Sequence, residues 1–237
     1  MHKFVDVGNP RHMETVEYAP GRFADVYGDP AQRTVLMWHG AQVDARATMG
    51  PLAERVADRG AGVVVPDWNS RAADRGRADL LGSLGFVRAR WTTPIVLVGW
   101  SLGGAAAAGA TIHAAEFEFE LAQTVCLAGA FMVAESVSGQ TLPTDLTDFG
   151  TGAPFTLMHG VHDQIIPVDV SRDFAAILRR NGWPVELTEL PTDHAAIAGA
   201  AYDEAGDRYL PASDAQALVI AEAVAEKIAN IARAERL

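Results

Sequence analysis

Short apolar runs alternate with longer amphipathic stretches along most of the chain, beginning near Thr34. Runs rich in Val, Leu, Ile and Thr that end at Gly, Pro or Asp are typical of buried strands, and apolar positions spaced three and four residues apart are typical of helices. Their alternation predicts strands joined by crossover helices in a mainly parallel sheet. The predicted strands are Thr34–Met37, Gly62–Pro66, Pro94–Val98, Thr124–Ala128, Pro154–Met158 and Val185–Leu190, and the predicted helices are Thr48–Arg59, Ala78–Arg90, Leu102–His113, Val170–Arg180 and Asp214–Arg233.

Two further strands are expected at the start of the sheet. Val16–Tyr18 and Phe23–Tyr27 flank Pro20 and Gly21, which is typical of an antiparallel hairpin. The total is then about eight strands. We therefore expect a three-layer α/β/α sandwich, and because no repeat or linker interrupts the 237 residues, a single domain over 1–237.

Composition and charge narrow the class of protein. A hydrophobic content of 49% is enough for a sizeable core. The net charge of −11 argues against nucleic acid as a partner, because phosphate binding depends on Lys and Arg. The opening Met1–Asp6 lacks the features of a secretory signal, and no apolar run is long enough for a membrane span, so we expect a cytoplasmic protein with no membrane partner. Cys126, the single cysteine, lies in an apolar run and is expected to be a buried structural thiol.

The strongest chemical signal is the sequence Gly-Trp-Ser-Leu-Gly over residues 99–103. It follows the predicted strand Pro94–Val98 and precedes a small-residue helix, which is the setting that a Gly-x-Ser-x-Gly nucleophile motif requires. Gly99 and Gly103 leave room for a sharp turn that raises the Ser101 hydroxyl above the sheet. Ser101 is therefore the predicted nucleophile.

A serine hydroxyl needs a neighbouring base and an acid that orients the base. Asp163 lies in the loop after the predicted strand Pro154–Met158, and His194 lies in the loop after the next strand. Both loops should emerge at the carboxyl edge of the sheet, where Ser101 also lies. The order Ser, Asp, His along the chain is the order of this class of fold.

With these motifs the chain resembles α/β-hydrolases of the small, capless kind that includes short-chain carboxylesterases and dienelactone hydrolases. The resemblance covers roughly residues 14 to 235 and rests on the nucleophile turn, the Gly-x-x-Asp-x-x-Ile-Pro loop at 160–167, His194, and a His-Gly turn at 38–41. It implies the catalytic residues Ser101, Asp163 and His194, and an oxyanion hole formed by the N–H groups of Ala41 and Leu102. Dienelactone hydrolases carry cysteine where this chain has serine, so an esterase is the better match.

Several other residues compete for these roles. Glu135, after the preceding strand, is the alternative acid, since some members of the family place the acid there. His39 is expected to support its turn. His159, His162 and Asp163 offer a conceivable metal cluster, but their spacing on an extended strand end argues against it, and we expect no metal and no cofactor.

The remaining polar residues near these loops have structural interpretations. We expect Asp44, Asp67 and Asp193 to cap helices or turns, His113 to lie at a helix end or on the surface, and Trp100 to pack beneath the nucleophile turn.

The predicted function is hydrolysis of a carboxylic ester or related acyl bond through an acyl-enzyme, with a small-molecule acyl substrate. Acyltransferase, thioesterase or lactonase activity on the same triad, and a non-catalytic binding protein of the same fold, stay open, as does a monomer or a homodimer. About 22 residues separate Phe131 from Pro154, too few for a multi-helix cap. The stretch Ala195–Ser213, with Tyr202 and Tyr209, is either a cover for the pocket beside His194 or a surface loop.

Overall fold

The computed structural model describes residues 13–29, 31, 33–92 and 94–234. Its main sheet has eight strands in the order β1-β2-β4-β3-β5-β6-β7-β8. β1 and β2, and β2 and β4, pair antiparallel, and every other pair in the sheet is parallel. The predicted mainly parallel sheet of about eight strands is confirmed. The strands are β1 Met13–Ala19, β2 Arg22–Tyr27, β3 Thr34–Trp38, β4 Gly62–Pro66, β5 Ile95–Trp100, β6 Leu121–Leu127, β7 Phe155–Gly160 and β8 Val185–Leu190.

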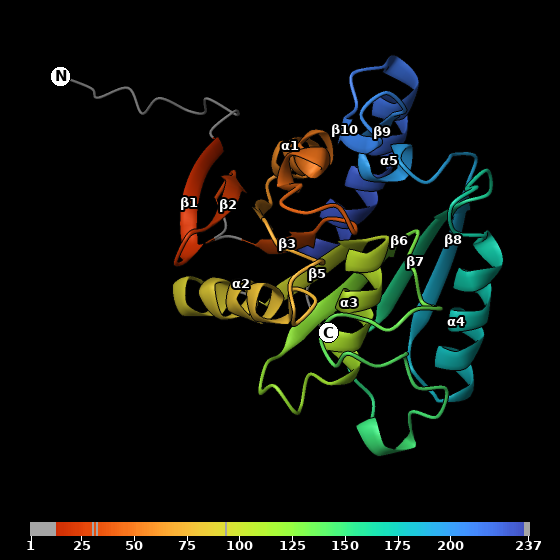
Figure 1. Ribbon diagram of the computed structural model, residues 1–237. Helices are drawn as coiled ribbons and strands as arrows, with labels where there is room; N and C mark the ends of the chain where they lie inside the picture. The colour runs from red at the N-terminus through yellow and green to blue at the C-terminus, as the bar shows by residue number, and fades with distance from the viewer. Residues whose placement is uncertain (1–12, 30, 32, 93, 235–237) are drawn as a thin grey trace.

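Helices cover both faces of this sheet, which confirms the three-layer sandwich. α1 and α5 pack against each other on one face, while α2, α3 and α4 lie along the other (Figure 1). Between β6 and β7 the only helix in the described part of the chain is the short 3-10 helix Thr147–Phe149, so no large cap interrupts the fold there. The long helices are α1 Gly50–Ala57, α2 Arg77–Arg90, α3 Leu102–Ile112, α4 Val168–Arg180 and α5 Ala215–Arg233, and two further 3-10 helices span Arg46–Met49 and Ala196–Ala198.

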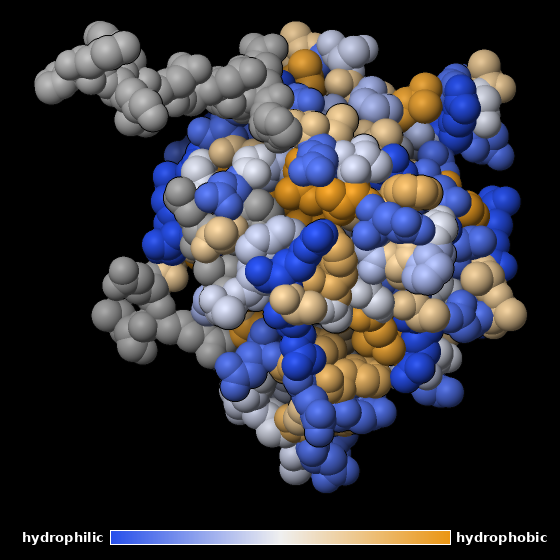
Figure 2. Space-filling model, turned by 90° about the vertical axis from the view of Figure 1, so that its left-hand side faces the viewer, coloured by the Kyte–Doolittle hydropathy of each residue, from blue (hydrophilic) through white to orange (hydrophobic). Residues whose placement is uncertain are grey.

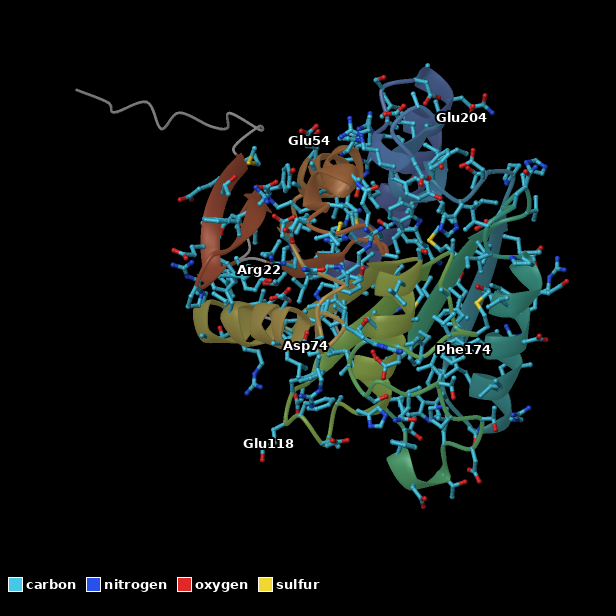
Figure 3. All side chains as sticks on the ribbon, in the orientation of Figure 1. Arg22, Glu54, Asp74, Glu118, Phe174 and Glu204 are labelled. Atoms are coloured by element: carbon cyan, nitrogen blue, oxygen red, sulfur yellow. The ribbon has the colours of Figure 1, made fainter. Side chains whose placement is uncertain are left out.

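The core follows from the alternation of side chains along the central strands. Val35 and Met37 of β3 face α1 and α5, whereas Leu36 and Trp38 face α2. Toward the β8 edge, Phe174 of α4 points to the sheet (Figure 3), and its ring lies 5.8 Å from that of Phe155. Apolar packing on both faces thus fixes the central strands, whose carboxyl ends carry the chemical residues.

A second, two-stranded sheet lies in the stretch 195–213, for which the sequence predicts either a cover for the pocket or a surface loop but no strands. This stretch contains the hairpin of β9 Ala200–Asp203 and β10 Arg208–Pro211. These strands pair only with each other and lie beside α5 (Figure 1). The Asp214 side chain then accepts the Ala217 N–H at 2.8 Å and caps α5.

The outer surface at the β1 edge is mixed in character. Figure 2 shows hydrophilic residues around smaller hydrophobic areas on this face. Met13 on β1 and Phe23 on β2 are among the exposed large apolar side chains. Within the described residues, no helix combines the length and apolar character needed to span a bilayer. The opening Met1–Asp6, from which a cytoplasmic protein was expected, lies outside the described residues.

Candidate active site

Ser101 occupies the sharp turn between β5 and α3. Its backbone has φ 56° and ψ −118°, a conformation that residues other than glycine rarely adopt. Hydrogen bonds hold it there, because the Ser101 N–H donates to Leu127 O at 2.9 Å and the Ser101 carbonyl accepts the N–H groups of Gly104, Ala105 and Ala130 at 3.0 to 3.1 Å. The turn is therefore strained and fully supported, as expected for a functional position.

Two glycines make this turn possible. A Cβ on Gly99 would lie 2.1 Å from Gly103 O, and a Cβ on Gly103 would lie 2.3 Å from His39 O. Backbone atoms are the obstacle in both cases, so the turn could not form with larger residues at these positions.

His194 and Asp163 are brought together as expected. Nδ1 of His194 lies 2.7 Å from Oδ2 of Asp163, and the Asp163 side chain is completely buried. The other carboxylate oxygen accepts the N–H groups of Ile165 and Ile166, each at 2.8 Å. Burial alone would raise the pKa of Asp163, but hydrogen bonds from His159, His194 and the Ile166 N–H outweigh it and hold that pKa well below its usual range. An ionised Asp163 only accepts, so the His194 proton sits on Nδ1 and Nε2 is left as a base.

His159 is a member of this cluster that sequence reasoning did not assign. It is fully buried at the end of β7, with Nε2 2.9 Å from Ile166 O and 3.3 Å from Asp163 Oδ2, and with Nδ1 2.7 Å from the Ser171 hydroxyl. Because a carbonyl only accepts, Nε2 must carry a proton, and in the neutral ring the Ser171 hydroxyl then donates to Nδ1. His159 and His194 thus bind the same carboxylate oxygen from two sides.

The loop that carries His194 rests on Trp100. The indole Nε1 donates to the His194 carbonyl at 2.8 Å, and the Trp100 and His194 rings lie 5.5 Å apart. Tyr209 of β10 packs edge-on against Trp100 at 4.9 Å. Trp100 therefore lies beneath the turn, as predicted, and also joins the nucleophile turn to the histidine loop.

The His-Gly turn after β3 approaches Ser101 closely. A Cβ on Gly40 would lie 3.4 Å from the Ser101 Cβ, so the next residue, Ala41, stands beside the nucleophile. Burial lowers the pKa of His39 to about 4, and its ring bonds to Gly40 O and to the N–H groups of Ala45 and Trp68. His39 is thus a neutral support of its turn.

Leu102 directly follows the nucleophile in the chain. It is the first residue of α3, where N–H groups have no partner inside the helix.

Glu135, the alternative acid, lies elsewhere. It is fully buried near Gly109 of α3, and its carboxylate accepts the N–H groups of Val137 and Ser138 and the Ser138 hydroxyl. This carboxylate stabilises its own loop, and only Asp163 contacts His194.

The other predicted structural roles are partly corrected. Asp193 accepts the N–H groups of Ala195 and Ala196 and caps that turn, as expected. Asp44 instead forms an ion pair with Arg22 at 2.8 Å. Asp67 accepts the Arg46 N–H at the start of a 3-10 helix, and it also pairs with the Arg46 side chain.

His113 ends α3, with Nδ1 3.0 Å from Glu116 on the surface. His162 is exposed while His159 is buried, and the described residues contain no group of three or more His, Cys, Asp or Glu side chains placed to hold a metal ion.

One pocket of about 970 Å³ contains the chemical groups. The loops at the carboxyl edge of the main sheet line it with Ala41, Ser101 and His194. The β9–β10 hairpin closes one side with Tyr202 and Tyr209. Glu204, at the tip of the hairpin, belongs to the same wall (Figure 3). The stretch 195–213 therefore covers the pocket beside His194, the first of its two predicted roles. Ser101 and His194 thus face the same space, and the hydrogen bond between a nucleophile and its base often tightens only when substrate binds.

Solved structures of known proteins share the fold of this chain. Esterase 2 of Thermogutta terrifontis, phosphoramylated by tabun, matches with a TM-score of 0.69 at 16% identity, over 98% of this chain and 100% of that chain. The S-formylglutathione hydrolase FrmB of Staphylococcus aureus matches with a TM-score of 0.66 at 16% identity, over 96% and 99%. The chain has the α/β-hydrolase fold.

A Pyrococcus furiosus esterase has the same fold, with a TM-score of 0.62 and 16% identity over 81% of this chain and 88% of that chain. No family model matches the sequence, and no curated protein matches it. At this identity the α/β-hydrolase fold is what the neighbours establish.

Proposed function

We propose that this protein is a serine hydrolase that cleaves a carboxylic ester through Ser101, His194 and Asp163. One observation carries the proposal: a serine held in a strained turn shares a pocket with a histidine whose Nδ1 lies 2.7 Å from a buried carboxylate. This arrangement leaves the His194 Nε2 free to accept the serine proton.

In the proposed mechanism, His194 Nε2 takes the proton of Ser101 as Oγ attacks the ester carbonyl. The N–H groups of Ala41 and Leu102 stabilise the oxyanion of the tetrahedral intermediate. His194 then passes the proton to the departing alcohol, which leaves an acyl group on Ser101. Water, deprotonated by the same Nε2, cleaves this acyl-enzyme and releases the carboxylic acid. Each oxyanion donor is worth about 10²- to 10³-fold in kcat in enzymes of this kind.

The neighbouring structures support an acyl substrate without defining it. Several are esterases, one of them modified by the organophosphorus compound tabun, and another is named for a thioester, S-formylglutathione. We therefore propose hydrolysis of a small ester, and thioesters and lactones should be tested as substrates in the same assay.

A fluorophosphonate probe tests the nucleophile directly. We expect it to label the wild type and not Ser101→Ala, and we expect Ser101→Ala to lose turnover of p-nitrophenyl esters while its circular dichroism spectrum is unchanged. A panel of p-nitrophenyl esters, thioesters and lactones then ranks the substrates, and product analysis with a competing alcohol separates hydrolysis from acyl transfer. Equal labelling of wild type and variant would show that Ser101 is not the nucleophile.

A further inference from the structure

The β9–β10 hairpin depends on contacts outside itself. Its two strands have four residues each, and an isolated two-stranded hairpin is marginally stable in water at best. It nevertheless forms a wall of the pocket through Ala200, Ala201, Tyr202 and Tyr209. Something outside the hairpin must therefore hold this wall in place.

The side chain of Gln42, 167 residues before Tyr209, holds the hairpin in place. Its Oε1 accepts the Tyr209 N–H at 2.7 Å, and its Nε2 donates to the Tyr209 carbonyl at 3.0 Å. A primary amide presents one acceptor and donors side by side, as a peptide group does. Gln42 therefore pairs with the outer edge of β10 in the way that a residue of a third strand would.

This contact meets the proposed catalytic groups at three points. Gln42 directly follows Ala41, the proposed oxyanion donor, in the turn after β3. The Tyr209 ring packs 4.9 Å from Trp100, which precedes Ser101, and Trp100 in turn donates to the His194 carbonyl. β10 therefore lies against the segments that carry the proposed catalytic groups, so its position sets one boundary of the space beside them.

We propose that Gln42 is a positioning residue of this site, which fixes the β9–β10 wall and so determines which acyl or alcohol groups fit the pocket. The effect on substrate specificity rests on the proposed ester hydrolysis, whereas the effect on the order of the hairpin does not. Without the two bonds of Gln42, the hairpin moves away from Trp100 and the pocket loses a fixed wall. Esters long enough to reach Tyr202 and Tyr209 lose more binding than short ones.

Gln42→Met tests the inference, because methionine keeps the length of the side chain and removes both hydrogen bonds. We expect at least tenfold faster amide exchange at Tyr209, measured by hydrogen–deuterium exchange of peptides spanning 200–211, with exchange in β5 unchanged. We also expect KM to rise about tenfold for long p-nitrophenyl esters and less than threefold for the acetate, as two lost neutral hydrogen bonds allow. Gln140→Met is the matched control, since Gln140 is exposed on the loop after β6.

Unchanged exchange at Tyr209 in Gln42→Met would overturn the positioning role. Faster exchange with the same KM values across the ester series would overturn the specificity role. Gln42→Glu provides a second variant of equal size, which keeps the bond to the Tyr209 N–H and loses the donor to its carbonyl, so its exchange should fall between wild type and Gln42→Met. Wild-type inactivity toward every ester would overturn the proposed function and leave the exchange experiment informative.

Discussion

Asp163→Asn should remove most of the activity, because it changes which nitrogen of His194 carries the proton. The asparagine oxygen can still accept the N–H groups of Ile165 and Ile166, which places its NH₂ group where Oδ2 now lies, 2.7 Å from His194 Nδ1. His159 Nε2–H also points at that position and cannot reverse, since Ile166 O fixes its proton. His194 must then present an unprotonated Nδ1, and its Nε2–H faces Ser101.

The size of this effect follows from the wrong tautomer. In another serine hydrolase triad the equivalent change costs about 10⁴ in kcat, which corresponds to about 5–6 kcal/mol of barrier. We expect a loss of about 10³- to 10⁴-fold here, with KM within a few-fold of wild type. The assay is steady-state hydrolysis of a p-nitrophenyl ester at pH 7, with active-site titration to count folded sites.

Glu135→Gln is the control, because Glu135 was the alternative acid and lies in its own loop. It should lower stability and leave kcat within a few-fold. If Asp163→Asn kept kcat within tenfold of wild type, or if Glu135→Gln lost it, the acid would be assigned wrongly.

Three further predictions concern stability. Ser101→Gly should melt about 3 °C above Ser101→Ala in calorimetry, because glycine relieves a φ of 56° worth about 1 kcal/mol; equal melting temperatures would show that the turn is not strained. His159→Leu removes a hydrogen-bond donor to Asp163. The lowered pKa of Asp163 stabilises the fold above about pH 4, and this stabilisation is lost as the pH falls toward the pKa of the folded state. Urea unfolding should therefore show the variant about 1–2 kcal/mol less stable at pH 7 and closer to wild type at pH 3, and a constant gap would contradict this. Arg46→Met leaves two buried carboxylates unpaired and should cost about 2–3 kcal/mol in urea unfolding, and a cost below about 1 kcal/mol would show that the cluster is unimportant.

The central elements could be predicted from the sequence because their signals are local. Strands β4 and β8 have the predicted bounds, since each is a short apolar or alternating run closed by a turn residue. β6 begins earlier than expected, at Leu121, because the polar Gln123 is accommodated by a bond to the Thr156 hydroxyl of β7. It ends earlier, because Ala128 takes a positive φ of 46°.

In the candidate site, too, the residues with local sequence signals could be predicted, and those that depend on tertiary packing could not. Ser101, Asp163 and His194 each follow a strand in a recognisable local sequence, so their shared edge could be predicted from the chain order. The buried role of His159 depends on Ser171, which reaches it only because α4 packs on β7. Nothing in the sequence around His159 identifies that partner.

The β9–β10 hairpin was missed for a related reason. Its strands have four residues each, and the charged residues Asp203 and Arg208 flank the turn between them. Such a pattern is typical of a surface loop. Its order comes from Gln42, 167 residues earlier in the chain, and pairing over such a distance leaves no periodicity to find.

The backbone angle at Ser101 also limits which nucleophiles this turn could carry. At φ 56° a side chain branched at Cβ is crowded by its own main chain, whereas an unbranched one is tolerated at a cost. Cysteine could replace serine here with its sulfur in nearly the same place, while threonine, chemically the nearer relative as an alcohol, could not. A protein with this turn can therefore replace the oxygen of its nucleophile by sulfur, but it cannot add a methyl group to the Cβ of that residue.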